Sequence, residues 1–189
     1  ASHGRTLLAN NDINLKMYKG ETLGLVGESG CGKSTFMRFL VSLDTPSEGE
    51  ILYRGTDITK LKGDAEKKFR KRVQMIFQDP YASLDPRMTI GDIIGEPLDI
   101  QLKLPAKERM ERVLKTMDRV GLNTRYVNRY PHEFSGGMRQ RIVIAIALAN
   151  KPKLIIADEP TTALDVTIQA QVLMLMEELK KKLGTSMIM

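Results

Sequence analysis

The amino-acid sequence predicts an α/β domain built on a parallel sheet, with a helical insertion. Short apolar runs alternate with longer segments in which apolar residues recur at helical spacing. An apolar run at residues 22–26 (TLGLV) leads through a glycine-rich loop into a helical pattern at residues 33–43, which is how a parallel α/β sheet begins. From residue 88 to residue 130 helical spacing replaces this alternation, which predicts the insertion.

Length and composition narrow the class of protein. The 189 residues suit one domain, and 42% apolar with 28% charged residues is typical of a folded globular protein and excludes disorder as the main state. No apolar run reaches the roughly 20 residues that span a bilayer. The single cysteine, Cys31, excludes an internal disulfide and a cysteine-cage metal site, and a reducing, cytosolic setting is expected.

The net charge of +6 permits nucleic acid, an anionic membrane surface or small anionic ligands as partners. The densest basic run, residues 67–72 (KKFRKR), is interpreted as a solvated helix face. Aromatic residues make up 5% of the chain and tryptophan is missing, which disfavours stacking platforms for single-stranded nucleic acid.

The predicted elements follow in chain order. Extended segments broken by a turn at Lys19 and Gly20 lead into the loop and helix already described, and two further strands are expected at residues 51–53 and 73–77. Pro105 and Gly121 bracket a predicted helix. The remaining elements are a buried helix at residues 135–150, a buried strand at 153–157, an amphipathic helix at 166–183 that Gly184 ends, and a strand at 185–189. A chain that stops on an apolar strand is expected to be a fragment.

The loop between the first strand and helix reads GESGCGKST, which fits the phosphate-binding pattern GxxxxGK[ST]. Its glycines are expected to permit backbone angles that side chains forbid, so that amide groups and the helix N-terminus bind phosphate oxygens. Lys33 is expected to reach the β- and γ-phosphates of a nucleotide, Ser34 to bind Mg²⁺ and Thr35 to contact the α-phosphate. The predicted ATP-binding residues are Gly27, Glu28, Ser29, Gly30, Cys31, Gly32, Lys33, Ser34 and Thr35.

A second motif, LIIADE at residues 154–159, places two acids after an apolar strand. Ligands bind at the carboxyl ends of parallel strands, so Asp158 is expected to hold Mg²⁺ and Glu159 to deprotonate the attacking water. Such acids can also cap a helix, but the phosphate loop favours the functional interpretation. Cys31 has no local base to activate it and is interpreted as a tolerated small residue, although a helix N-terminus can lower the pKa of a thiol.

Three further segments resemble the ABC (ATP-binding cassette) ATPases. FSGGMRQR at residues 134–141 resembles the family's signature motif, QMIFQDPYASLDPR at 74–87 the Q-loop region of the oligopeptide/dipeptide importer branch, and TTALDVTIQAQ at 161–171 that branch's D-loop and following helix. The resemblance runs from about residue 13 to the end. It implies one P-loop NTPase domain over residues 1–189, truncated at the C-terminus, with an N-terminal antiparallel β subdomain and a helical insertion at about 88–134.

The resemblance also implies roles for single residues. Gln78 would contact Mg²⁺ and the attacking water and link the nucleotide to the helical subdomain. Ser135, Gly136 and Gly137 would bind the γ-phosphate of ATP held by a second cassette, and Asp165 would lie at the dimer interface. Two cassettes would meet head to tail, as a homo- or heterodimer, with ATP and Mg²⁺ between them.

The chain departs from the family pattern at three places. Phe134 and Met138 stand where leucine and glutamine are usual. Residues 2–8 hold no aromatic residue to stack on adenine, and the chain ends before the family's switch histidine. The chain as given is therefore expected to bind Mg-ATP but to hydrolyse it slowly.

The function that this resemblance implies is that of the ATP-hydrolysing subunit of an ABC importer for peptides, nickel or another small solute. It would lie at the cytoplasmic face of the membrane on transmembrane permease subunits, with a solute-binding protein as an indirect partner and no nucleic acid. Two alternatives stay open: an ABC ATPase acting on DNA or ribosomes, and a nucleotide-dependent dimerisation module without useful catalysis.

Overall fold

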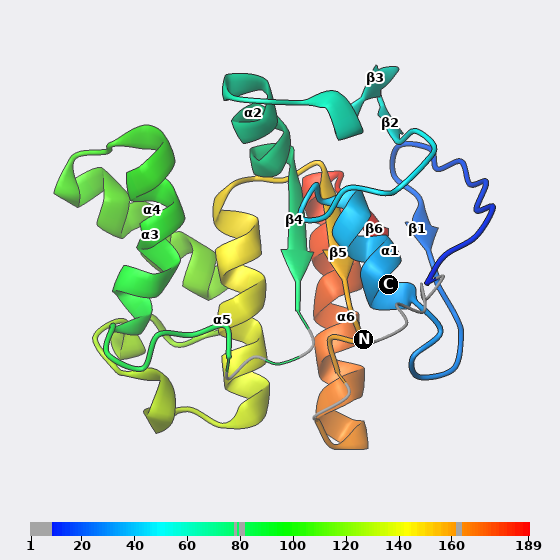
Figure 1. Ribbon diagram of the computed structural model, residues 1–189. Coiled ribbons are helices and arrows are strands. Elements are labelled where there is room, and N and C mark those ends of the chain that lie inside the picture. Colours follow the sequence, from blue (N-terminus) through cyan, green and yellow to red (C-terminus); the bar gives the residue numbers. More distant parts are fainter. Residues whose placement is uncertain (1–8, 78, 80–81, 162–163) are drawn as a thin grey trace, which may run out of the picture.

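A parallel four-stranded sheet forms the centre of the computed structural model, which describes residues 9–77, 79, 82–161 and 164–189 (Figure 1). Neighbouring strands in the sheet are far apart in the sequence, as the crossover connections of an α/β fold require. The predicted α/β class with a parallel sheet is confirmed. In spatial order the strands are β1 (Thr22–Leu23), β6 (Ser186–Ile188), β5 (Leu154–Ala157) and β4 (Val73–Ile76).

The strands are shorter than the apolar runs that predicted them. β1 covers two of the five residues expected at 22–26. One further backbone bond, from the Leu25 amide to the Met189 carbonyl at 2.6 Å, continues the pairing of β1 with the chain beyond β6. At the other edge the amide of Asp158 donates to the carbonyl of Ile76 at 2.9 Å, so Asp158 lies at the carboxyl end of the sheet.

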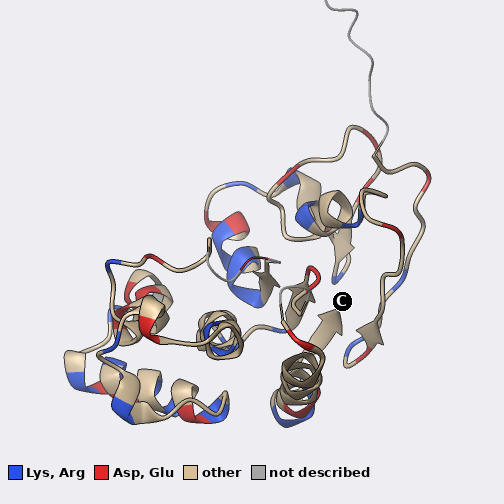
Figure 2. Ribbon diagram, turned by 90° about the horizontal axis from the view of Figure 1, so that it is seen from below, with Lys and Arg blue, Asp and Glu red and all other residues tan. Residues whose placement is uncertain are grey.

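Two helices cover opposite faces of the sheet, α1 (Lys33–Leu40) and α6 (Val166–Leu183), as the end-on view of Figure 2 shows. α6 has the bounds that its apolar spacing predicts, and it ends at Gly184 in the left-handed conformation. α1 ends three residues earlier than predicted, because Ser42 adopts a positive φ of 59° that a helix cannot continue through.

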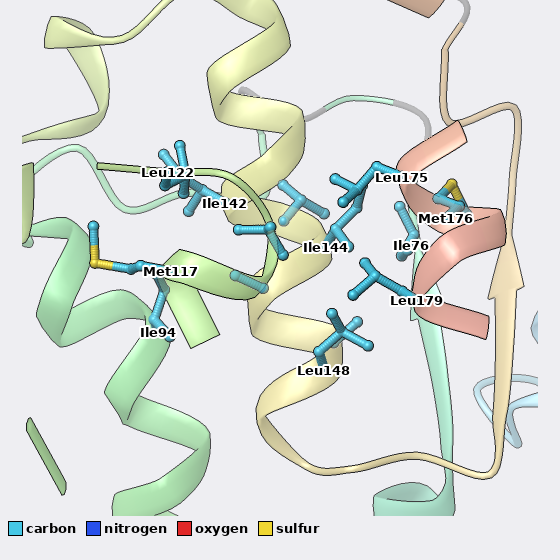
Figure 3. Close-up of a cluster of buried hydrophobic side chains, with 14 of the residues drawn as sticks. Ile76, Ile94, Met117, Leu122, Ile142, Ile144, Leu148, Leu175, Met176 and Leu179 are labelled. Atoms are coloured by element: carbon cyan, nitrogen blue, oxygen red, sulfur yellow. The ribbon is translucent and has the colours of Figure 1, made fainter. Parts of the chain in front are cut away.

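Side chains that alternate along the strands pack into two separate hydrophobic cores. Ile155 of β5 and Met187 of β6 belong to the larger core, which includes residues of α5 (Gly136–Ala149) and α6 (Figure 3). The next residue of each strand, Ile156 and Ile188, belongs to the smaller core with Met37 of α1. This period of two is what a strand buried on both faces requires.

The predicted helical insertion contains α3 (Ile90–Leu102) and α4 (Ala106–Arg119), with 3₁₀ turns at Thr124–Tyr126 and Pro131–Glu133. Arg109 of α4 ties the two helices together, since its Nε lies 2.6 Å from Asp99 and its terminal nitrogen 3.7 Å from Asp92, both on α3. Gly121 follows α4 with a φ of 71°, as expected of the residue beyond a helix end. Whether these helices behave as a separate subdomain stays a prediction.

Antiparallel pairing among the described residues is limited to one hairpin, β2 (Leu52–Tyr53) with β3 (Thr56–Asp57). A 3₁₀ turn at Ile58–Lys60 leads from it to α2 (Asp64–Arg72). Phe69 is the buried residue of α2, and the lysines and arginines around it are exposed or half-buried, so the basic run is the solvated helix face that the sequence predicts (Figure 2). No helix in the described part of the chain is both long and apolar enough to cross a bilayer.

Candidate functional site

The glycines of the loop at residues 27–35 serve two different purposes. Gly30 and Gly32 adopt positive φ angles of 81° and 96°, as the sequence predicts. Gly27 does not, so the expectation is wrong for this residue. Its role is steric, because a Cβ there would stand 2.6 Å from the sulfur of Cys31. The loop thus needs glycine for backbone angle at two positions and for close approach at the third.

The N-terminus of α1 is left open for an anion. Gly32 caps it without a side chain, and the first turn carries no acidic residue, so the residues at the start of the helix do not themselves satisfy its first amide groups. Ser34 is exposed and Thr35 half-buried in that turn. A Cβ on Gly32 would lie 2.3 Å from the carbonyl oxygen of Ala9, so this glycine also lets the chain before β1 lie against the loop.

Lys33 is folded back onto its own loop. Its Nζ donates to the carbonyl of Gly27 at 2.5 Å and to the carbonyl of Glu28 at 2.9 Å. The sulfur of Cys31 lies 3.8 Å from the same nitrogen. The side chain of Lys33 is 16% exposed to solvent, so its ammonium group is held in place by these contacts.

The structure brings the two predicted motifs together. The Nζ of Lys33 lies 3.8 Å from a carboxylate oxygen of Glu159, although the two residues are far apart in the sequence. Asp158 is 7% exposed at the end of β5. Glu159 follows with a φ of 44°, in the left-handed region that residues other than glycine rarely adopt. An unusual backbone conformation at a candidate general base fits a functional constraint.

The serine-glycine-glycine turn lies at the start of α5. Ser135 caps the helix, with its hydroxyl accepting from the amide of Met138 at 3.3 Å. A Cβ on Gly137 would stand 2.6 Å from Cγ2 of Ile168 on α6, whereas one on Gly136 would meet a methyl of Leu164 at an ordinary 3.5 Å. Packing within the chain therefore requires glycine at position 137, whether or not this residue also contacts a ligand.

Asp165 caps α6, where its carboxylate accepts from the amide of Ile168 at 3.0 Å. The turn before it is fastened by Gln169, whose amide nitrogen donates to the carbonyls of Thr161 and Leu164, each at 2.9 Å. Sequence reasoning missed Gln169, although an amide four residues after a helix cap can reach back to the preceding turn.

Gln78 lies outside the described residues. Among the described residues beyond it, the hydroxyl of Ser83 donates to the carbonyl of Asp79 at 2.9 Å. Further on, Arg87 donates hydrogen bonds to Asp85 and lowers the pKa of that carboxyl group to about 2.

The two departures within the signature are explained by packing. Phe134 is 4% exposed and its ring meets that of Tyr126 edge-on at 6.1 Å, so the larger side chain fills the core between α5 and the 3₁₀ turns. Met138 packs against the same core. Residues 2–8, where the sequence offers no aromatic residue to stack on adenine, lie outside the described part.

The predicted site residues within the described part form two groups, on segments at the end of the molecule where the strands have their carboxyl ends (Figure 1). The loop group contains residues 27–35 with Asp158 and Glu159, and the turn group contains Ser135, Gly136 and Gly137 with Leu164 and Asp165. The loop group offers amides, an ammonium and oxygen ligands, which suits a polyphosphate with a hard cation. The turn group offers the N-terminus of α5, whose first turn carries no acidic residue.

Comparison with known sequences gives a consistent result. The sequence model of the family described as "ABC transporter" matches residues 10–162. The chain is 57% identical over 181 residues to the oligopeptide transport ATP-binding protein OppF of Bacillus subtilis, covering 95% of this chain and 59% of OppF. It is 51% identical to the dipeptide transport ATP-binding protein DppF of Haemophilus influenzae, covering 94% of this chain and 54% of DppF. The chain thus spans little more than half the length of these relatives.

Solved structures agree. A dimeric structure of the cassette MJ0796 in a post-hydrolysis state, bound to ADP and Pi, matches with a TM-score of 0.84 at 33% identity, covering 95% of this chain and 78% of that one. The cbiO1 protein of Clostridium perfringens, part of the ABC transporter complex cbiONQ, matches with a TM-score of 0.85 at 30% identity, covering 95% of this chain and 70% of that one.

Proposed function

The chain belongs to the ABC transporter family, and we propose that it is the ATP-binding and ATP-hydrolysing part of a subunit that powers import of peptides or a related small solute. The observation that carries the proposal is the approach of Lys33 to Glu159, at 3.8 Å. It unites a phosphate-binding loop with a carboxylate able to accept a proton. The names of the similar OppF and DppF proteins support peptides as the solute class.

The residues present fit ATP with Mg²⁺. The hydroxyl of Ser34 is exposed in the first turn of α1, and the carboxylate of Asp158 lies at the end of β5. These are oxygen ligands, and Mg²⁺ is usually held by one or two such groups together with substrate phosphates. The described residues contain no cluster of three metal-ligating side chains, and such a site needs none. Bound Mg²⁺ would neutralise charge on the phosphates.

The reaction proposed is hydrolysis of ATP to ADP and phosphate. Lys33 exchanges the carbonyls of Gly27 and Glu28 for the β- and γ-phosphate oxygens, and the open amides of α1 bind the phosphates beside it. Glu159 accepts a proton from the attacking water, whose oxygen bonds to the γ-phosphorus while the bond to the β-phosphate oxygen breaks. Charge stabilisation and positioning supply most of the rate.

The turn group is proposed to act on ATP held by a second cassette. Its serine is exposed and its glycines half-buried, so its amides are accessible to a ligand that this chain does not itself hold. The pair of cassettes would dock on permease subunits at the cytoplasmic face of the membrane. Gln78, by its resemblance to the Q-loop glutamine, would link the nucleotide to that contact.

An ATPase of DNA or ribosomes is not favoured, because the curated relatives with these identities are transport proteins by name. ATP turnover is the measurable property that distinguishes our proposal from a dimerisation module without catalysis.

The test is steady-state phosphate release with Mg-ATP, compared with the Lys33→Ala variant. We expect turnover that depends on Lys33, and no stimulation by DNA. Absence of turnover in the full-length protein together with its permease would contradict the proposal. The same assay on residues 1–189 alone checks the expectation of slow hydrolysis by this piece.

A further inference from the structure

One buried polar side chain has no role in the site described above. Gln140, on the second turn of α5, is fully buried at 0% exposure. Neither its Nε2 nor its Oε1 has a hydrogen-bond partner within the described part of the chain. The helix residues that follow Arg141 are apolar and nearly all buried.

An amide in this condition costs folding free energy, because it gives up its bonds to water and gains none in the protein. Almost all buried side-chain amides in native proteins are bonded, so an exception calls for an explanation. A methionine or leucine would fill the same volume without the cost. The cost is accounted for if the amide finds its partner in another state of the molecule.

The direction of the side chain follows from its place on the helix. Gln140 is four residues after Gly136 and three after Gly137, so the three share one face of α5. Gly136 faces Leu164, and Gly137 faces Ile168. One turn further on, Ile144 belongs to the same buried cluster as Leu175 of α6 (Figure 3). The face that carries Gln140 is therefore packed on α6 and on the turn that leads into it.

The turn between β5 and α6 connects the loop group of the site to the turn group. It leaves β5 through Glu159, with its positive φ of 44°, and reaches α6 at Asp165. Gln169 fixes it from the side of α6 through the carbonyls of Thr161 and Leu164. On the side of α5, Gln140 is a buried polar side chain without a hydrogen-bond partner among the described residues, and its amide could supply a corresponding bond.

We propose that Gln140 is a positioning residue whose amide binds the backbone of the turn after β5 only in the reacting arrangement of the ATP-bound protein, and so holds Glu159 in place for hydrolysis. The inference rests on the proposed ATPase function. A bond formed in only one of two states shifts the equilibrium toward that state. Because the bond is missing before the reaction, it stabilises the reacting arrangement without strengthening the first binding of ATP.

The test is the variant Gln140→Met, which keeps the length of the side chain and removes its polar atoms. Without nucleotide, its melting temperature is expected to rise by about 2–4 °C, because the unpaired amide is gone. In the ATPase assay of the full-length protein, kcat is expected to fall about 3- to 10-fold, the equivalent of one hydrogen bond, with KM unchanged. Gln171→Met, at an exposed position of α6, is the matched control and should change neither.

A Gln140→Met variant that melts lower than wild type would show that the amide is already bonded at rest, and would overturn the inference. So would an unchanged kcat beside an active wild type. A wild-type protein without ATPase activity would instead overturn the proposed function and this inference with it. Opposite changes of stability and turnover are not expected from a residue with a purely structural role.

Discussion

The loop group and the turn group are both built on a helix N-terminus, but they are held in opposite ways. In the loop group the main ligand-binding side chain is occupied, since the Lys33 ammonium binds two carbonyls of its own loop and lies beside Glu159. In the turn group the exposed serine only caps its helix, and the contacts that fix the turn are made by its glycines against Leu164 and Ile168.

The difference reflects where each group's ligand comes from under our proposal. The loop group binds a nucleotide within its own chain, so its charged groups satisfy one another until the nucleotide replaces them. The turn group meets a nucleotide held by another chain, so it must keep its shape without a ligand. Packing can fix such a shape, whereas a flexible charged side chain cannot.

The largest expected effect is a loss of ATP hydrolysis, without a loss of ATP binding, when the carboxylate of the loop group is replaced. Glu159→Gln keeps the shape of the side chain but cannot accept a proton from water. We expect hydrolysis to fall by about 10²–10⁴-fold, the usual contribution of a general base, while ATP still binds and stabilises a dimer. Phosphate release and size-exclusion chromatography with Mg-ATP measure the two properties. A variant with normal turnover would remove Glu159 from the role of base.

The next effect concerns binding itself. Lys33→Ala is expected to weaken ATP binding by about 100-fold or more, because at least two charge-assisted hydrogen bonds of about 1.5–3 kcal/mol each are lost. Titration with a fluorescent ATP analogue measures it. Lys181→Ala, on the exposed end of α6, is the matched control. Unchanged affinity in the Lys33 variant would mean that the loop is not the nucleotide site.

The smallest effect concerns stability without nucleotide, and it tests whether packing fixes the turn group. Gly137→Ala places a methyl group against Ile168 and should lower the free energy of unfolding by about 1–3 kcal/mol. Gly136→Ala makes ordinary contact with Leu164 and should change it by less than about 1 kcal/mol. Urea unfolding of both variants gives the comparison. Equal stabilities would show that ligand binding alone requires the second glycine.

Sequence reasoning predicted the class of fold, most of the elements in their order, and the unusual backbone angles of Gly30 and Gly32. These features depend on local patterns, such as the spacing of apolar residues on α6 and the glycines before Lys33. It was less successful where distant segments meet. The steric role of Gly27 and the packing of Gly137 on Ile168 depend on three-dimensional contacts with no local signal.

The same limit applies to Gln140 and Gln169. Both are glutamines in helical segments. The spacing of Gln169 from the helix cap allows a bond to the preceding turn but does not require one, and nothing near Gln140 distinguishes a buried amide from a solvated one. Only the fold shows that one is enclosed and that the other fastens a turn. The early end of α1 at Leu40 likewise follows from backbone angles beyond it, which the apolar spacing does not encode.

Under our proposal the loop group of one chain works with the turn group of another, and a mixture of two inactive variants distinguishes this arrangement from one within a single chain. Lys33→Ala disables the loop group. Gly136→Asp adds a negative charge to the turn group at the position where a side chain fits. In full-length protein each variant alone should lack ATPase activity, because every paired site then contains one disabled group.

In a mixture, some pairs join the intact loop of the Gly136→Asp variant to the intact turn of the Lys33→Ala variant. We expect phosphate release to reappear and to be greatest near equal amounts of the two variants. A mixture as inactive as its components, although size-exclusion chromatography shows that the two chains associate, would contradict the account.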